Sequence, residues 1–236
     1  MSLLTVVQRF CERNNLNSPS TVYGTTDAQI TQIKGLLEEE CTDLATRGNW
    51  NELTFEATHT TLATESQGAI STIASNGFRN IKPDTLWDRT LKLPLGILND
   101  VEWAAQKGFS TTSPRYQVRI RGGLLLANPI PTAGNIWAFE YISKNWILGA
   151  DGTTYKKYFT LDTDNILLPE ELVTLGLRWR WLKEIGFDYA EAFRTYETQV
   201  TQALGSNGLK KRLNMSGGQT ARQPGISISQ GNWSVP

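Results

Sequence analysis

The chain has little of the chemistry on which most enzymes and metalloproteins depend. Its 236 residues include a single histidine, His59, and only two cysteines, Cys11 and Cys41. One histidine gives no support for a Ser-His-Asp triad, a Cys-His pair or a zinc site built on histidines. Two cysteines are too few for a disulfide scaffold, so we expect both to be free thiols. We therefore expect no catalytic residue, no metal and no cofactor, and we interpret His59 as a strand histidine, at the surface or hydrogen-bonded.

An excess of charge and a long apolar run are absent as well. Lys and Arg together number 23, as do Asp and Glu, so the formal net charge is zero. A nucleic-acid-binding protein usually carries a basic excess, and this sequence has none. No apolar stretch approaches the length that spans a membrane, and the N-terminal residues lack the basic region and cleavage site of a signal peptide. We expect a protein that is made and assembled inside a cell.

Two stretches resemble known binding loops only in part. The "DTDN" stretch begins like a calcium loop but lacks the turn glycine and the distal glutamate, so we expect Asp162 and Asp164 to cap a turn. The "RIRGG" stretch resembles a phosphate-binding loop but lacks its lysine and the helix that should follow. Its Gly122-Gly123 pair instead predicts a two-residue β-hairpin turn.

Several short signals predict where helices begin and end. Ser2 is a suitable cap for a first helix, and Thr26 with Gln29 three residues later fits the capping box of a second. Gly48 is a plausible end for that second helix. In the middle of the chain, Asn99 is expected to cap a short helix.

The clearest pattern predicts one long helix over 168–200. Its apolar seam advances in steps of four and three through Leu168, Leu172, Leu175, Trp179, Leu182, Gly186, Tyr189, Phe193, Tyr196 and Val200. One helix cannot bury such a seam alone, and the N-terminal helices carry matching apolar stripes. We therefore expect residues 1–50 and 166–205 to form an antiparallel helical bundle.

The middle and the end of the chain differ in composition and in the pattern of apolar residues. Residues 51–165 are rich in threonine and alternating apolar positions with glycine turns, which is typical of strands. Residues 206–236 are polar, glycine-rich and without period, which predicts a flexible tail. The fold class expected is α+β, with a helical bundle, a β-rich inserted domain and an extended C-terminal tail.

Two groups of residues are candidates for contact with partner proteins. Aromatic side chains supply large contact area, and four of them are assigned to subunit or tail contacts: Trp137, Tyr141, Trp146 and Trp181. In residues 206–236, three basic residues would steer the approach to an acidic surface, and three isolated apolar residues would anchor it. These six are Lys210, Lys211, Arg212, Ile226, Ile228 and Trp233.

Four segments taken in order carry a resemblance to a known family. They are "TTDAQITQIKGLLEEECTDLATRGNW", "LANPIPTAG", "FEYISKNWI" and "DTDNILLPEELVTLGLRWRWLKEIGFDYAEAFRTYETQV". Together they resemble the head-to-tail adaptor proteins of short-tailed bacteriophages, also called tail tubular protein A-like or head-completion proteins. The resemblance covers most of residues 1–205, and its specificity lies in the order of the segments rather than in any one motif.

The resemblance implies a structural role in the virion, with no catalytic motif to carry over. Members of that family form a ring, twelve-fold in the relatives, that docks on the portal protein and presents a platform for the tail nozzle protein. Genomic DNA passes through the lumen without specific binding. The resemblance thus implies a location at the head-tail interface and assembly in the host bacterial cytoplasm. The composition of residues 206–236 adds the prediction that the six tail residues dock on the portal. A tail fibre or spike is a further candidate contact for the β-rich region.

Two other classes of function stay open at the level of sequence. The first is a carbohydrate-binding or tail-fibre-attachment module that uses exposed tryptophans of the β-rich region. The second is a peptidoglycan hydrolase packaged with the tail, which is disfavoured because the sequence offers no acid pair in an apolar setting and no metal-ligand cluster.

Overall fold

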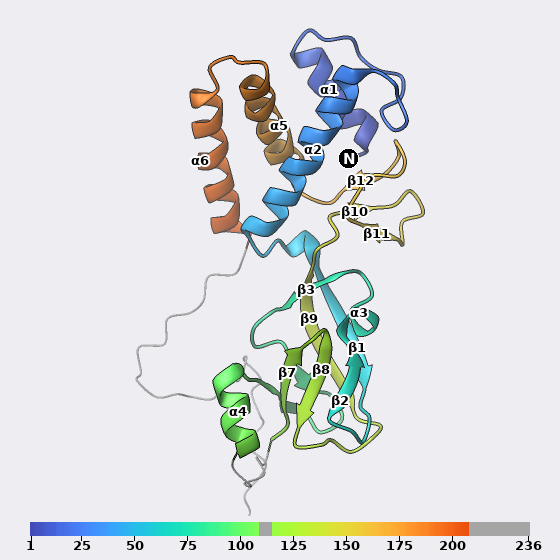
Figure 1. Ribbon diagram of the computed structural model, residues 1–236, viewed down its shortest axis with the longest axis vertical. Coiled ribbons are helices and arrows are strands. Elements are labelled where there is room, and N and C mark those ends of the chain that lie inside the picture. Colours follow the sequence, from blue (N-terminus) through green and yellow to red (C-terminus); the bar gives the residue numbers. More distant parts are fainter. Residues whose placement is uncertain (109–114, 208–236) are drawn as a thin grey trace, which may run out of the picture.

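The computed structural model describes residues 1–108 and 115–207. The chain is α+β, as predicted, with the four longest helices gathered at one end of an elongated molecule and most strands, with two short helices, at the other (Figure 1). None of the helices within the described ranges is long and apolar enough to cross a membrane. The six candidate portal-docking residues, Lys210, Lys211, Arg212, Ile226, Ile228 and Trp233, lie outside the described residues.

Four helices form the helical body. They are α1 (Leu3–Arg13), α2 (Ala28–Arg47), α5 (Glu170–Glu184) and α6 (Ala190–Ser206). Helix α5 packs against the other three, so segments from both ends of the chain share one core. The Ser2 hydroxyl accepts a hydrogen bond from the N–H of Thr5 at 3.3 Å and caps α1 as predicted. Helix α2 begins one residue later than expected, because Asp27 rather than Thr26 accepts the first N–H groups.

The single long helix predicted over 168–200 is wrong, because the chain reverses direction there. Helix α5 ends at Glu184, α6 begins at Ala190, and Gly186 lies between them at φ +77°. A residue without a Cβ adopts this left-handed conformation readily, and it ends a helix. The two halves of the seam therefore pack against each other, with the ring centroids of Trp179 and Phe193 5.1 Å apart.

A small sheet completes the helical body. It contains β10 (Ile147–Leu148), β11 (Tyr155–Lys156) and β12 (Asn165–Ile166), in the order β11-β10-β12. The apolar side chains around these strands belong to the helical core rather than to the core of the other strands. These strands begin and mostly lie within 51–165, the predicted β-rich insertion, but their apolar side chains pack with the helices.

Two further sheets form the β body. The first contains β1 (Thr54–Thr60), β9 (Ile136–Ser143), β4 (Trp87–Asp88) and β5 (Leu93–Pro94) in that order, with β3 (Phe78–Ile81) also paired to β9. The second contains β2 (Ser66–Ala69), β8 (Leu124–Asn128), β7 (Gln117–Arg121) and β6 (Gly96–Ile97). Short helices accompany them: η1 (Asn51–Leu53), α3 (Ile70–Ile73) and α4 (Asp100–Gly108).

The two sheets share one apolar core, and local signals set their turns. The core side chains come from both sheets and include Ala57, Val118, Leu125, Trp137, Phe139 and Tyr141. Strands β7 and β8 form the predicted hairpin, and Gly122 and Gly123 have φ values of +60° and +75°. Two consecutive positive φ angles are what a type I′ hairpin turn requires.

Candidate interaction surfaces

The described residues contain no group of three or more His, Cys, Asp or Glu side chains placed to hold a metal ion. Asp162 accepts hydrogen bonds from the N–H groups of Val22 and Tyr23, at 3.0 and 2.7 Å. Asp164 accepts the N–H of Thr160 at 2.7 Å and pairs with a lysine ammonium. Both carboxylates therefore hold loops, as expected of capping residues. Cys11 and Cys41 are free thiols, as predicted, and both are buried.

The aromatic residues assigned to partner contacts are core residues instead. Trp137, Tyr141, Trp146 and Trp181 are all buried within the chain. Strand β9, which carries the first two, is central in its sheet and is covered on both faces. The Trp181 ring packs edge-on against Phe10. The assignment of these four side chains to subunit or tail contacts is therefore wrong, because none of them offers surface to a partner.

The hypothesis of a carbohydrate-binding module required exposed tryptophans in the β-rich region, and the structure buries most of them. Four tryptophans lie between residues 51 and 165, and Trp103, Trp137 and Trp146 are buried while Trp87 is half-buried. A sugar-binding platform needs an exposed aromatic face, and no tryptophan of this region provides one. The exposed apolar surface of this region comes instead from other side chains.

An exposed apolar patch surrounds the turn between α5 and α6, at the end of the molecule farthest from the β body (Figure 1). The exposed fractions are 41% for Ile185, 65% for Phe187, 40% for Tyr189 and 37% for Phe193. We call these four residues the turn patch. The sequence pattern placed Tyr189 and Phe193 in a buried seam, so this surface was missed. The available signal was Gly186 in the sequence "EIGFDY".

A second exposed apolar patch lies at the opposite end, on the tip of the β body. We call its members, all exposed, the distal patch: Leu62, Leu91, Leu93, Ile130 and Ile136. They lie where β1 ends, between β8 and β9, where β9 begins and where the chain turns from β4 to β5. The two patches thus occupy opposite ends of the long axis (Figure 1).

A buried carboxylate holds the distal tip in place. Asp88 is 1% exposed and accepts a hydrogen bond from the indole N–H of Trp137 at 3.0 Å. It also accepts the backbone N–H groups of Thr90 and Leu91, at 2.9 and 2.8 Å. The amide of Asn135 donates to the same carboxylate at 3.3 Å. These contacts fix the turn that presents Leu91, so the patch is supported by hydrogen-bonded core residues.

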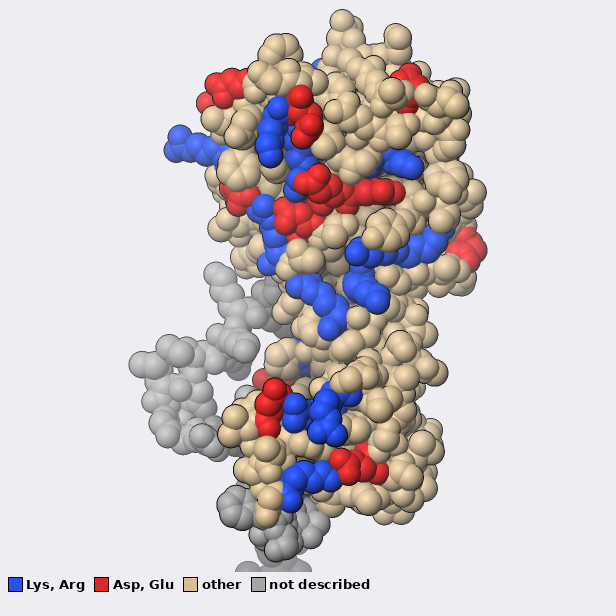
Figure 2. Space-filling view, viewed as in Figure 1, with Lys and Arg blue, Asp and Glu red and all other residues tan. Residues whose placement is uncertain are grey.

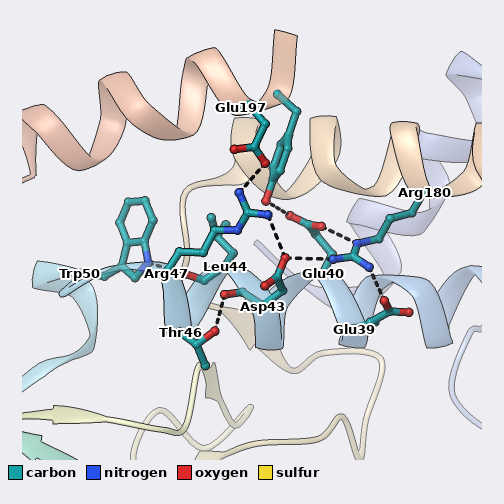
Figure 3. A network of polar contacts seen from close by, with 10 residues as sticks. Glu39, Glu40, Asp43, Leu44, Thr46, Arg47, Trp50, Arg180 and Glu197 are labelled. Atoms are coloured by element: carbon teal, nitrogen blue, oxygen red, sulfur yellow. Dashed lines mark hydrogen bonds and ion pairs between the residues drawn. The ribbon is translucent and has the colours of Figure 1, made fainter. Parts of the chain in front are cut away.

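A second buried carboxylate organises the helical body (Figure 3). Glu40 of α2 is fully buried, and its carboxylate accepts a hydrogen bond from the Nε of Arg180, on α5, at 2.6 Å. The hydroxyl of Tyr196, on α6, also donates to Glu40. Burial raises the pKa of Glu40, and these two partners offset the effect only in part. Burial and the hydrogen bond to Glu40 raise the pKa of Tyr196 well above its ordinary value, so it stays a donor.

Two arginines extend this network toward the surface of α2. Arg180 also pairs with Glu39, and with Asp43 at 3.1 Å. Arg47 bridges Asp43 at 3.1 Å and Glu197 of α6 at 2.5 Å (Figure 3). Three helices are therefore joined by charge-assisted hydrogen bonds, which are stronger than neutral ones.

The outer face of α2 stays acidic despite this pairing. Figure 2 shows Asp and Glu side chains gathered across the middle of the helical body on this side. A shallow groove of about 640 Å³ follows the helix there, lined by Gly35, Glu38, Glu39, Thr42, Asp43, Thr46, Tyr158 and Arg180. We call this surface the acidic face. Within the described part of the chain, Glu38 has no ion-pair partner, and the Glu39 side chain is 63% exposed.

The sequence was also compared with known proteins. A scan against protein-family models finds no matching family, and a search of curated proteins finds no similar chain. The interaction surfaces therefore supply the main argument about function.

Proposed function

We propose that this chain is the subunit of a head-to-tail adaptor ring, which docks on a phage portal and links it to the tail nozzle. The observation that carries the proposal is the pair of exposed apolar patches at opposite ends of one elongated subunit. The order of segments in the sequence supports it independently. The role is structural rather than catalytic, and the location is the head-tail interface of the virion.

Two apolar ends are what a connector between two different partners requires. Exposed apolar surface clustered on a monomer is typical of protein contact sites, and aromatic side chains dominate their energetics. Phe187, 65% exposed, is the largest single contributor at the helical end. Complete burial of such a side chain is worth about 1.5–3 kcal/mol. We assign the turn patch to the portal and the distal patch to the nozzle, with a fibre or spike as a further contact of the β body.

The ring and its lumen complete the proposal. The helices from both ends of the chain act as the antiparallel bundle of each subunit, and residues 206–236 act as a portal-docking tail. Lys210, Lys211 and Arg212 steer that tail, and Ile226, Ile228 and Trp233 anchor it. A formal net charge of zero suits a lumen through which DNA must slide, because strong phosphate binding would retain it.

Paired surface variants test the two ends separately. Phe187→Ser should weaken binding to the portal encoded alongside this chain by at least about tenfold and leave nozzle binding unchanged. Ile130→Ser, on the distal patch, should do the reverse, so each variant is the matched control of the other. Sedimentation with purified portal rings and with purified nozzle measures both. The proposal fails if the wild-type chain binds neither partner, or if both variants bind both partners as tightly as the wild type does.

A truncation tests the docking role of the tail. The cut belongs after Asn207, because the backbone carbonyl of Asn207 accepts a hydrogen bond from Asn51, and the Leu204 side chain packs closely on Gly48. The shortened chain should keep its melting temperature and lose sedimentation with the portal. Unchanged portal affinity would show that residues 208–236 take no part in docking.

A further inference from the structure

Helix α5 presents two arginines to opposite sides of the helical body. Arg178 and Arg180 are two positions apart, which places their side chains about 200° apart around a helix of 3.6 residues per turn. Arg180 points to α2, where it binds Glu40. Arg178 therefore points away from α2, and it lines one groove with α1 and a second with Asp188 and Glu191 of the α6 end.

A groove of about 340 Å³ lies on that other side, between α1 and α5. It is lined by Phe10, Arg13, Asn14, Thr174, Leu175 and Arg178. Its accessible apolar surface comes from half-buried Leu175, with the buried ring of Phe10 beneath it, and its charge comes from the exposed residues Arg13 and Arg178. No acidic residue lines it, and neither arginine has an ion pair within residues 1–108 and 115–207. We call it the arginine groove.

The chemistry of the arginine groove calls for carboxylates carried on a partly apolar surface. A guanidinium group binds a carboxylate with two parallel hydrogen bonds, and two such groups over an apolar floor favour a pair of acidic side chains. The acidic face of α2 has this composition, because it offers Glu38 without an ion-pair partner within the described residues, the 63% exposed side chain of Glu39, which also pairs with Arg180, and the ring of Tyr158. The two surfaces are complementary in charge and lie on opposite sides of the same body.

We infer that the arginine groove of one copy takes the acidic face of α2 of a second copy. Because the two surfaces are different patches on opposite sides, the contact is head-to-tail, and a bound pair of copies leaves one groove and one acidic face free. Such a contact repeats until the rotation closes it into a ring. The inference rests on the proposed function for the ring and adds the surfaces that join its subunits.

Engineered cysteines test the contact directly, since Cys11 and Cys41 are buried and do not interfere. Full-length chains carrying Arg178→Cys or Glu38→Cys alone should give no disulfide-linked species when assembled with portal and oxidised. A mixture of the two should give dimers only. A chain carrying both substitutions should give a ladder of higher multimers. A disulfide between two Arg178→Cys chains would show a two-fold contact and overturn the inference, and so would the absence of a ladder.

Charge reversal tests the energetics of the same contact. Arg178→Glu should weaken self-association by at least about tenfold, and adding Glu38→Arg to the same chain should restore it. Arg194→Glu makes the same charge change on exposed α6, outside the groove, and should have no effect. If Arg178→Glu leaves assembly intact and only lowers retention of a short DNA duplex, the groove binds phosphates and the inference is wrong.

The two proposals fail in different ways. Rings that assemble on the portal but are indifferent to every variant of the groove and the acidic face would overturn this inference and leave the adaptor role standing. A multimer ladder from a chain that never binds portal or nozzle would support the contact and overturn the adaptor role.

Discussion

The helical body and the β body each bury one carboxylate, and they use it differently. Glu40 joins α2 to residues 140 and 156 positions later in the chain, and one of its partners is a guanidinium. Asp88 is held by neutral N–H donors from neighbouring strands and turns. Strand pairing already sets the register of a sheet, whereas helices can slide and rotate against one another. We infer that Glu40 fixes the alignment of three helices, while Asp88 only positions a tip.

The largest effect should come from crowding Glu40. A Cβ added at Gly176 would lie 2.1 Å from the buried carboxylate, so Gly176→Ala must displace it from Arg180 and Tyr196. Breaking a buried ion pair costs about 3–5 kcal/mol, and we expect a loss of that size in urea unfolding. Gly35→Ala is the control, because a Cβ there meets nothing within 4 Å. Equal stability of the two variants would remove Glu40 from its aligning role.

Two aromatic truncations in the helical body should lower the free energy of unfolding by different amounts, although both residues lie in the predicted seam. Trp179→Ala should cost about 3–5 kcal/mol, the range for a buried aromatic residue. Phe193 is 37% exposed, so Phe193→Ala should lose little beyond its ring contact with Trp179, about 1 kcal/mol. Thermal melts of the two variants measure the difference. Equal losses of stability in the two variants would mean that Phe193 packs more deeply than its exposed fraction indicates.

Loss of the buried carboxylate of Asp88 should destabilise the β body less than displacement of Glu40 destabilises the helical body. Asp88→Ala leaves the indole N–H of Trp137 without its acceptor, which costs about 1–3 kcal/mol for a buried donor. The ion pair of Asp100, which is 89% exposed, with Arg119 provides the control, and Asp100→Ala should change stability by less than about 1 kcal/mol. Unfolding followed by tryptophan fluorescence measures both. If Asp88→Ala lowered the free energy of unfolding as much as Gly176→Ala does, the two buried carboxylates would not differ in role.

The smallest effect is a pH dependence at the junction of the small sheet with α1. Burial alone would raise the pKa of Asp164, but hydrogen bonds from Lys156 and two backbone N–H groups outweigh it and lower the pKa. Its stabilising contribution is therefore complete above the unfolded value of about 3.9 and is lost as the pH falls through the lower folded pKa. The stability gap between wild type and Asp164→Asn should be widest at neutral pH and shrink on acidification. A gap that is constant with pH would contradict this account.

Local signals allowed much of the framework to be predicted. Ser2 caps α1, Gly48 follows the end of α2, and Gly122-Gly123 makes the β7–β8 hairpin. Asn99 and Glu102 exchange hydrogen bonds at the start of α4, as a capping pair does. Each of these features depends on backbone preferences within a few residues, so the sequence nearby is sufficient to specify it.

The candidate surfaces could not be predicted in the same way. The steps of the apolar seam continue through Gly186, and only the reversal of the chain there exposes Phe193 beside Phe187. Alternation along β9 shows that two faces differ, but it does not tell which face other elements cover. Trp137 and Tyr141 were therefore assigned to a surface although both are buried.

What the sequence determined by itself is the α+β class, the caps, the hairpin turn and the scarcity of catalytic groups. What only the tertiary structure decided is which apolar residues remain exposed and which charges meet. Glu40 and Arg180 are separated by 140 positions, and no local preference brings them together. Exposure and pairing at that range depend on how whole elements pack, because burial is a property of everything that surrounds a side chain and not of its own segment.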